Sequence, residues 1–292
     1  MTSRLPDQGE VKAPRRALAN GHHATERFDE FAFDDAPSVT TPLPGPVSRD
    51  LLDGQEELES NACSYPRGIP VAFEEGRGAT LRDADGNTFI DFFAGAGVLC
   101  VGHGNAVVAK AATEQQGRLV HSLDFPSAAR LQLTRSLKRI LPGQLSRAAR
   151  LHFGGPTGSD AVEAAIKLAR IHTGRDPIVA FQGSYHGMTA GALAVTADTR
   201  LGGPTSASVH FFPFPYGYRS PLGLDGTSCW RGCATLLETA IADPHSGVPK
   251  PAAVIVEPIQ GEGGTIVPPR GFLREVRRIT HEHDVLLIAD EI

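Results

Sequence analysis

The segment VLLIADEI, residues 285–292, places Asp290 and Glu291 directly after an apolar run. Such a run is typical of a buried strand, so the two carboxylates would stand at the strand's carboxyl end. Burying a carboxylate costs free energy unless a cation or a proton donor pairs with it. We therefore expect Asp290 to contact a cationic or protonated partner.

A glycine-rich loop opens the segment GGPTGSDAVEAAIKLAR, residues 154–170. Apolar residues at helical spacing follow it, with Asp160 and Glu163 as an N-cap-like pair. The free N–H groups and the positive dipole end of a helix N-terminus favour an anion, so Gly158 and Ser159 are candidate phosphate ligands. The spacing matches neither a P-loop nor a dinucleotide motif. Taken alone, the loop is explained equally well as a structural turn.

The segment FQGSYHGMT, residues 181–189, holds Tyr185 and His186 in a loop after a strand-like run. An aromatic side chain in this position could stack on a flat ligand. Simple packing of the tyrosine is the alternative.

Carboxylates follow another strand-like run in VEPIQGEGG, residues 256–264. Glu257 would stand at the strand end, and Glu262 in a loop whose glycines allow a ligand to approach closely. Paired acids could do acid/base work, but in a solvated loop they also cap helices or bind arginines.

Together, a phosphate cradle, an aromatic side chain and a buried acid favour a flat, phosphorylated ring with a protonatable nitrogen. Pyridoxal 5′-phosphate meets all three requirements, because the acid would keep the pyridine nitrogen protonated and the ring able to accept electrons.

The elements that must position these residues are short apolar runs that alternate with helical patterns from Arg150 onward. Strands buried on both faces and joined by helices predict a mainly parallel sheet and an α/β fold. Ligands of such sheets bind beyond the carboxyl ends of the strands, where Glu257 and Asp290 both fall. The predicted strands are RLHF (150–153), PIVAF (177–181), AAVIVE (252–257) and VLLIAD (285–290), with GFLREVRRITHEHD (271–284) as a helix.

The first part of the chain has a different character. Residues 1–55 are rich in Pro, Asp, Ser and Thr and predict a disordered tail. ATLRDADGNTFIDFF, residues 79–93, predicts a hairpin that turns at Asp85-Gly86. Helical patterns follow GHGN and cover about 127–140. The predicted domains are the N-terminal part of a small domain (56–105) and a ligand-binding large domain (106–292).

Composition limits the function classes. The 292 residues carry a net charge of −5, which argues against a nucleic-acid surface, and no run of eighteen apolar residues predicts a membrane span. The polar sequence after Arg15 and Arg16 does not suit a signal peptide, so we expect a cytoplasmic location. The spacing of Cys229 and Cys233 fits isolated thiols better than a zinc site.

From about Leu58 to Ile292 the chain resembles class III, fold type I aminotransferases, and within them the diaminobutyrate–2-oxoglutarate aminotransferases. The resemblance implies a large domain with a mainly parallel sheet and helices on both faces, here incomplete, preceded by the N-terminal part of a small α+β domain. The matching phrases are ESNACSYPRGIPVAF, IDFFAGAGVLCVGHGN, HSLDF, FGGPTGSDAVEAAIKLAR, SYHGMTAGALAVT, AAVIVEPIQGEGG and LLIADEI.

The resemblance also implies roles around pyridoxal 5′-phosphate. Gly158 and Ser159 would hold the phosphate, and Tyr185 would stack on the ring with His186 beside it. Asp290 would pair with the pyridine nitrogen.

For the substrates, the resemblance implies that Glu257 supports the site and that Glu262 gates an arginine that recognises 2-oxoglutarate or glutamate. Ornithine- and acetylornithine-type relatives place an arginine where this chain has Met188, as diaminobutyrate enzymes do. We therefore expect transfer of the 4-amino group of L-2,4-diaminobutyrate to 2-oxoglutarate, in either direction, in ectoine or siderophore pathways. The alternatives are ornithine, acetylornithine or 4-aminobutyrate as donor, or a truncated homologue that acts as a non-catalytic binding partner.

The family's Schiff-base lysine lies roughly thirty residues beyond the DEI motif, and it would act as the covalent nucleophile. None of the lysines in this chain occupies that place. We expect a fragment or a truncated gene product, inactive by itself. The resemblance further implies that the intact enzyme is a homodimer, with HSLDF near the interface. The lysines are Lys12, Lys110, Lys138, Lys167 and Lys250.

Overall fold

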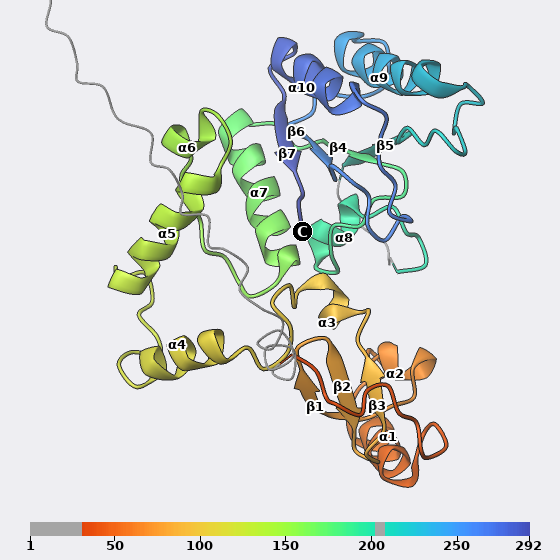
Figure 1. Ribbon diagram of the computed structural model, residues 1–292. Coiled ribbons are helices and arrows are strands. Elements are labelled where there is room, and N and C mark those ends of the chain that lie inside the picture. Colours follow the sequence, from red (N-terminus) through yellow and green to blue (C-terminus); the bar gives the residue numbers. More distant parts are fainter. Residues whose placement is uncertain (1–30, 202–207) are drawn as a thin grey trace, which may run out of the picture. The chain divides into compact units, whose positions relative to one another are not determined.

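The computed structural model describes residues 31–201 and 208–292 (Figure 1). Its chain divides into two compact units, residues 1–133 and 134–292. This division differs from the predicted domain boundary between residues 105 and 106. None of the described helices is long and apolar enough to cross a membrane.

The first unit contains a three-stranded antiparallel sheet of order β1-β2-β3. β2 and β3 form the predicted hairpin, with Thr80 opposite Ile90 and Gly86 at positive φ in the turn. The elements of this unit are α1 (Pro46–Leu58), α2 (Tyr65–Gly68), β1 (Phe73–Arg77), β2 (Thr80–Asp83), β3 (Thr88–Ile90), α3 (Ala94–Gly97) and α4 (Ala106–Gln116).

The prediction of a disordered tail is wrong for residues 31–55, whereas residues 1–30 lie outside the described part. Asp85 in the hairpin turn caps α1, because its two carboxylate oxygens accept the N–H groups of Val47 and Ser48 at 2.8 Å. Thr40 and Thr41 donate their N–H groups to the Asn87 side chain. These long-range bonds order a segment whose composition alone predicts disorder.

Two helices follow α4 along the chain: α5 (Ala128–Ile140) and α6 (Leu145–Ala148). α5 agrees with the helix predicted for about 127–140. The predicted strand at 150–153 is wrong. Residues 150–153 belong to neither of the two described sheets, so a short apolar run alone does not make a strand here.

The second unit is built on a parallel four-stranded sheet of order β5-β4-β6-β7. It confirms the α/β fold class and the βαβ unit at the end of the chain. β5 and the helix that follows it were not predicted. The elements are α7 (Gly158–Thr173), β4 (Ile178–Phe181), α8 (Ala190–Val195), β5 (Val209–Phe212), α9 (Gly226–Ala242), β6 (Ala253–Val256), α10 (Phe272–Glu282) and β7 (Leu286–Ala289).

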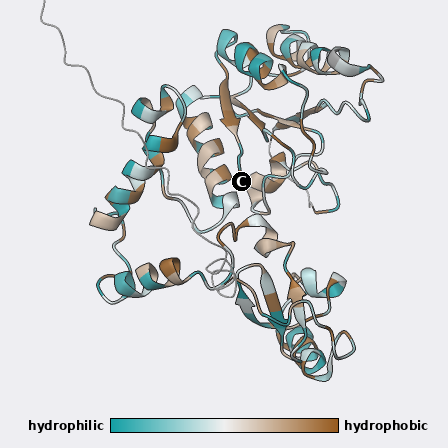
Figure 2. Ribbon diagram, viewed as in Figure 1, coloured by the Kyte–Doolittle hydropathy of each residue, from teal (hydrophilic) through white to brown (hydrophobic). Residues whose placement is uncertain are grey.

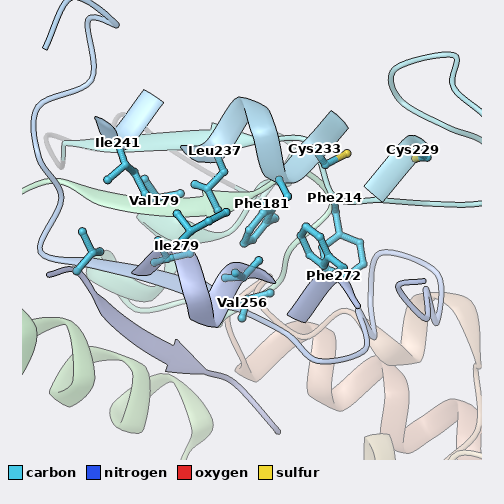
Figure 3. Packing of buried hydrophobic residues seen from close by; sticks show 14 residues of the cluster. Val179, Phe181, Phe214, Cys229, Cys233, Leu237, Ile241, Val256, Phe272 and Ile279 are labelled. Atoms are coloured by element: carbon cyan, nitrogen blue, oxygen red, sulfur yellow. The ribbon is translucent and has the colours of Figure 1, made fainter. Parts of the chain in front are cut away.

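Figure 2 shows that the strands of the parallel sheet are hydrophobic along their length. Alternate residues of the central strands belong to two separate hydrophobic clusters. Val179 and Phe181 of β4 pack on the α9/α10 side, and Ile178 and Ala180 pack on the α7/α8 side. Figure 3 shows the first of these clusters, in which Phe181 lies close to Phe272. The period of two residues explains why both central strands are apolar throughout.

The connections place a switch point between β4 and β6. The chain leaves β4 through α8 on one face of the sheet, and it leaves β6 through α10 on the other. Ligands of open α/β sheets bind at such a point, beyond the carboxyl ends of the strands. The loops at this switch point are residues 182–189 and 257–271.

Candidate active site at the carboxyl end of the sheet

Asp290 forms a buried pair with His186 just beyond the sheet. Nδ1 of His186 lies 2.7 Å from Oδ2 of Asp290, and the exposed fractions of the two side chains are 0% and 6%. A carboxylate only accepts hydrogen bonds, so the tautomer that suits this contact has Nδ1 as the donor. His186 is thus the partner that the sequence requires for Asp290.

Backbone contacts hold both members of the pair. The Asp290 N–H donates to the Val256 carbonyl at 2.9 Å, and the His186 N–H donates to Oγ1 of Thr196 at 2.9 Å. Oδ1 of Asp290 accepts the N–H of Ile292 at 3.2 Å. Nε2 of His186 is buried and has no hydrogen-bond partner among the described residues. A buried ring nitrogen without a partner is costly, which indicates that a further group belongs beside it.

The N-terminus of α7 reaches the same place. An added Cβ at Gly158 would lie 2.8 Å from Cδ1 of Ile292, and one at Gly187 would lie 2.0 Å from Oγ of Ser159. Oγ of Ser159 accepts the Met188 N–H at 3.2 Å, which leaves the hydroxyl proton free to donate. The structure therefore brings Gly158 and Ser159 beside the loop that carries His186.

The capping of α7 differs from the predicted N-cap-like pair of Asp160 and Glu163. Thr157 is the N-cap, and it forms a capping box with Asp160: Oγ1 of Thr157 accepts the Asp160 N–H, and the Asp160 carboxylate accepts the Thr157 N–H. The Thr-x-x-Asp spacing in the sequence could have identified this cap. Hydrogen bonds from Thr157 hold the pKa of Asp160 below its ordinary value. The backbone N–H groups of Gly158 and Ser159 have no partner among the described contacts and can receive an anion.

Glu257 links the two loops at the switch point. Its Oε1 accepts the Tyr185 N–H at 3.0 Å, and its Oε2 accepts the Gly261 N–H at 2.9 Å. Gln260, which sequence reasoning did not single out as a site residue, adds a second link, because its side chain donates to the Gln182 carbonyl at 2.9 Å. These bonds fix the backbone from which the Tyr185 ring projects.

Glu262 and Met188 lie at the solvent-exposed side of these loops. The Met188 side chain is 51% exposed, and Glu262 is also exposed and makes none of the described hydrogen bonds. The structure therefore does not bring Glu262 into the cluster formed by the other predicted residues.

The residues present fit pyridoxal 5′-phosphate. A helix N-terminus with free donors suits the phosphate, and the Asp290 carboxylate suits a protonated pyridine nitrogen. No cluster of metal-ligating side chains is found in the described part of the chain.

Comparison with known proteins agrees with this geometry. Residues 64–292 match the family model described as "Aminotransferase class-III". A diaminobutyrate–2-oxoglutarate aminotransferase from Haemophilus influenzae is 41% identical over 83% of this chain and 54% of its own length. One from Rhizobium meliloti is 43% identical over 82% of this chain and 52% of its own length. The chain spans about half the length of these relatives.

Solved transaminases share the fold. A thermostable omega-transaminase from Thermomicrobium roseum superposes with a TM-score of 0.74 at 30% identity, covering 84% of this chain and 57% of its own. A PLP-bound amine transaminase from an uncultivated Pseudomonas species gives a TM-score of 0.66 at 30% identity, covering 80% of this chain and 55% of its own. The family indicates pyridoxal 5′-phosphate as cofactor. The chain belongs to the class III aminotransferase family.

Proposed function

We propose that this chain binds pyridoxal 5′-phosphate at the carboxyl end of its parallel sheet, as part of a transaminase. The observation that carries the proposal is the buried pair of Asp290 and His186 beside the free N–H groups at the start of α7. When bound, pyridoxal phosphate carries an amino group from a donor to a 2-oxo acid, because its ring withdraws electrons from the reacting carbon.

The chain's own residues would orient the cofactor. The N–H groups of Gly158 and Ser159 and the Ser159 hydroxyl would hold its phosphate, and Tyr185 would stack on its ring. The Asp290 carboxylate would hold a proton at the pyridine nitrogen, and the hydrogen bond from Nδ1 of His186 fixes that carboxylate in place.

We further propose L-2,4-diaminobutyrate as amino donor and 2-oxoglutarate as acceptor, giving aspartate 4-semialdehyde and glutamate, or the reverse. Two relatives with this activity in their names, at 41% and 43% identity, support it. Met188 supports it as well, because by the resemblance ornithine- and acetylornithine-type enzymes have an arginine at this place. Glu262, exposed in the loop after β6, would act on an arginine that recognises the acceptor.

A donor panel tests this proposal. The protein that the gene encodes is assayed with diaminobutyrate, ornithine, acetylornithine or 4-aminobutyrate as donor and 2-oxoglutarate as acceptor. The glutamate formed is measured. We predict the highest kcat/KM for diaminobutyrate. Faster turnover of any other donor would refute the proposed substrate but not the cofactor site.

We also propose that the protein works as a homodimer, which rests on the resemblance. Light scattering during turnover checks it, and a fully active monomer would contradict it.

A further inference from the structure

We infer that Glu163 is a positioning residue that holds the loop carrying Tyr185 and His186 in register with the phosphate-binding end of α7. This inference rests on the proposed cofactor site. Glu163 and Ser159 lie four residues apart on α7 and therefore on one face of the helix. Both contact the segment that follows His186.

The contacts of Glu163 are directed at the start of α8. Its Oε1 accepts the Thr189 hydroxyl at 2.7 Å, the Gly191 N–H at 2.6 Å and the Ala192 N–H at 3.2 Å. Thr189 is the N-cap residue of α8, yet its side chain does not cap that helix. A carboxylate from another helix thus satisfies the free donors that a cap normally serves.

The approach of the two helices leaves no room for side chains at the contact. An added Cβ at Gly191 would lie 2.4 Å from Oε2 of Glu163, just as one at Gly187 would collide with Oγ of Ser159. The segment 187–192 is therefore fastened to α7 at two points: Ser159 contacts its first two residues, and Glu163 contacts its part from Thr189 onward. Figure 1 shows α8 beside α7.

The charge of Glu163 suits this task. Burial acts to raise its pKa, but the hydrogen bonds from Thr189, Gly191 and Ala192 outweigh burial and hold the pKa below its ordinary value. The ionised carboxylate can accept all three bonds at neutral pH. If this contact is lost, the start of α7 still offers its donors to a phosphate, whereas the ring-binding loop loses its alignment to that phosphate.

Binding measurements separate the two effects. Pyridoxamine 5′-phosphate carries the cofactor's ring and phosphate but lacks the aldehyde that reacts with surface lysines, so its affinity reports the site itself. Isothermal titration compares this compound with inorganic phosphate for the unaltered chain, Glu163→Ala, Glu163→Gln and Glu238→Ala. Glu238 is a matched control: a partly exposed helix carboxylate that bonds Arg278 on another helix, on the α9/α10 side of the sheet.

We expect Glu163→Ala to weaken pyridoxamine 5′-phosphate binding by roughly tenfold, since bonds to a charged group are lost. Inorganic phosphate binding should change less than about twofold, because its donors belong to α7. Glu163→Gln keeps an acceptor oxygen and should recover most of the affinity. Glu238→Ala should bind as the unaltered chain does.

Equal weakening of both ligands in Glu163→Ala would overturn the inference, as would unchanged affinity for both. Hydrogen exchange without ligand gives a second readout: the Gly191 and Ala192 amides should exchange faster in Glu163→Ala and not in Glu238→Ala. If the unaltered chain binds neither phosphate compound, the proposed cofactor site is refuted. The exchange rates then decide alone whether Glu163 fastens the loop, and unchanged rates would refute that too.

Discussion

The two faces of the parallel sheet are packed with different kinds of side chain. On the α9/α10 face, Phe181, Phe214 and Phe272 meet edge to face with ring centroids 5.6–5.9 Å apart. On the α7/α8 face there is no buried aromatic side chain in the described cluster, and half of its buried residues are alanines: Ala169, Ala180, Ala192, Ala252 and Ala253 lie there with Val162, Ile166, Ile178, Val195 and Ile255.

This difference indicates that one face mainly stabilises the fold and that the other positions the start of α7 at the site. Large aromatic side chains bury much apolar area and hold the sheet to α9 and α10. Small side chains let α7 and α8 approach the sheet and each other closely, which brings the start of α7 to the strand ends. We therefore expect substitutions on the first face to alter mainly the free energy of unfolding, and substitutions at the end of the second face to alter mainly cofactor binding.

The largest effect should come from Phe272→Ala. Phe272 is fully buried between Phe181 and Phe214, so its removal leaves a cavity and should lower the free energy of unfolding by about 3–5 kcal/mol. Urea denaturation measures this change. The folded variant should still bind pyridoxamine 5′-phosphate with unchanged affinity, and a selective loss of binding would break the division between the two faces.

Gly187→Ala should have the next largest effect. Gly187 has a φ of +120°, and a Cβ there would lie 2.0 Å from Oγ of Ser159, so the loop must shift away from α7. We expect a loss of about 1–3 kcal/mol in stability together with weaker ligand binding. Gly217→Ala is the control, since no φ strain or neighbouring atom opposes a side chain there. Equal behaviour of the two variants would contradict the contact.

Ser159→Ala is expected to cost about 1 kcal/mol, because the Met188 N–H loses its acceptor. The affinity for inorganic phosphate should also fall, since the hydroxyl donor is removed. Titration with phosphate measures this change, and an unchanged affinity would exclude the hydroxyl from the phosphate site.

The smallest effect at neutral pH concerns Cys233 on the α9/α10 face of the sheet. Burial is the largest cause and the neighbouring Cys229 the second of a raised pKa of the Cys233 thiol, from 9.0 to about 12. The unfolded chain then loses this proton at lower pH than the folded chain does. The contribution of this thiol to stability is constant below pH 9 and falls between pH 9 and about 12. Urea denaturation of Cys233→Ala across this range should show a shallower decline, and an equal slope would refute the shift.

The sequence predicted several elements whose signal lies within one segment, although the apolar run at 150–153 misled. The apolar runs of β4, β6 and β7 and the Asp-Gly turn predicted strands and a hairpin that the structure contains. The folded structure of residues 31–55 could not be predicted from their own composition. It depends on hydrogen bonds to Asp85 and Asn87, which lie about forty residues further along the chain.

The candidate site shows the same limit. Asp290 signals a buried acid by its place after a strand, but nothing local identifies His186, 104 residues earlier, as its partner. The prediction for Glu163 was wrong for a similar reason. An acid near a helix start predicts a cap for its own helix, whereas the Glu163 carboxylate accepts N–H groups at the start of α8.

The role of the Asp290 charge at the cofactor site is tested most directly by pyridoxamine 5′-phosphate titrations of the unaltered chain, Asp290→Asn and Asp284→Asn. Asparagine keeps an acceptor for Nδ1 of His186 but lacks the charge that would hold a proton at the pyridine nitrogen. Asp284, an exposed residue beyond the end of α10, is the control. We predict at least roughly tenfold weaker binding for Asp290→Asn and none of this loss for Asp284→Asn. Equal affinity of all three folded proteins would contradict the account.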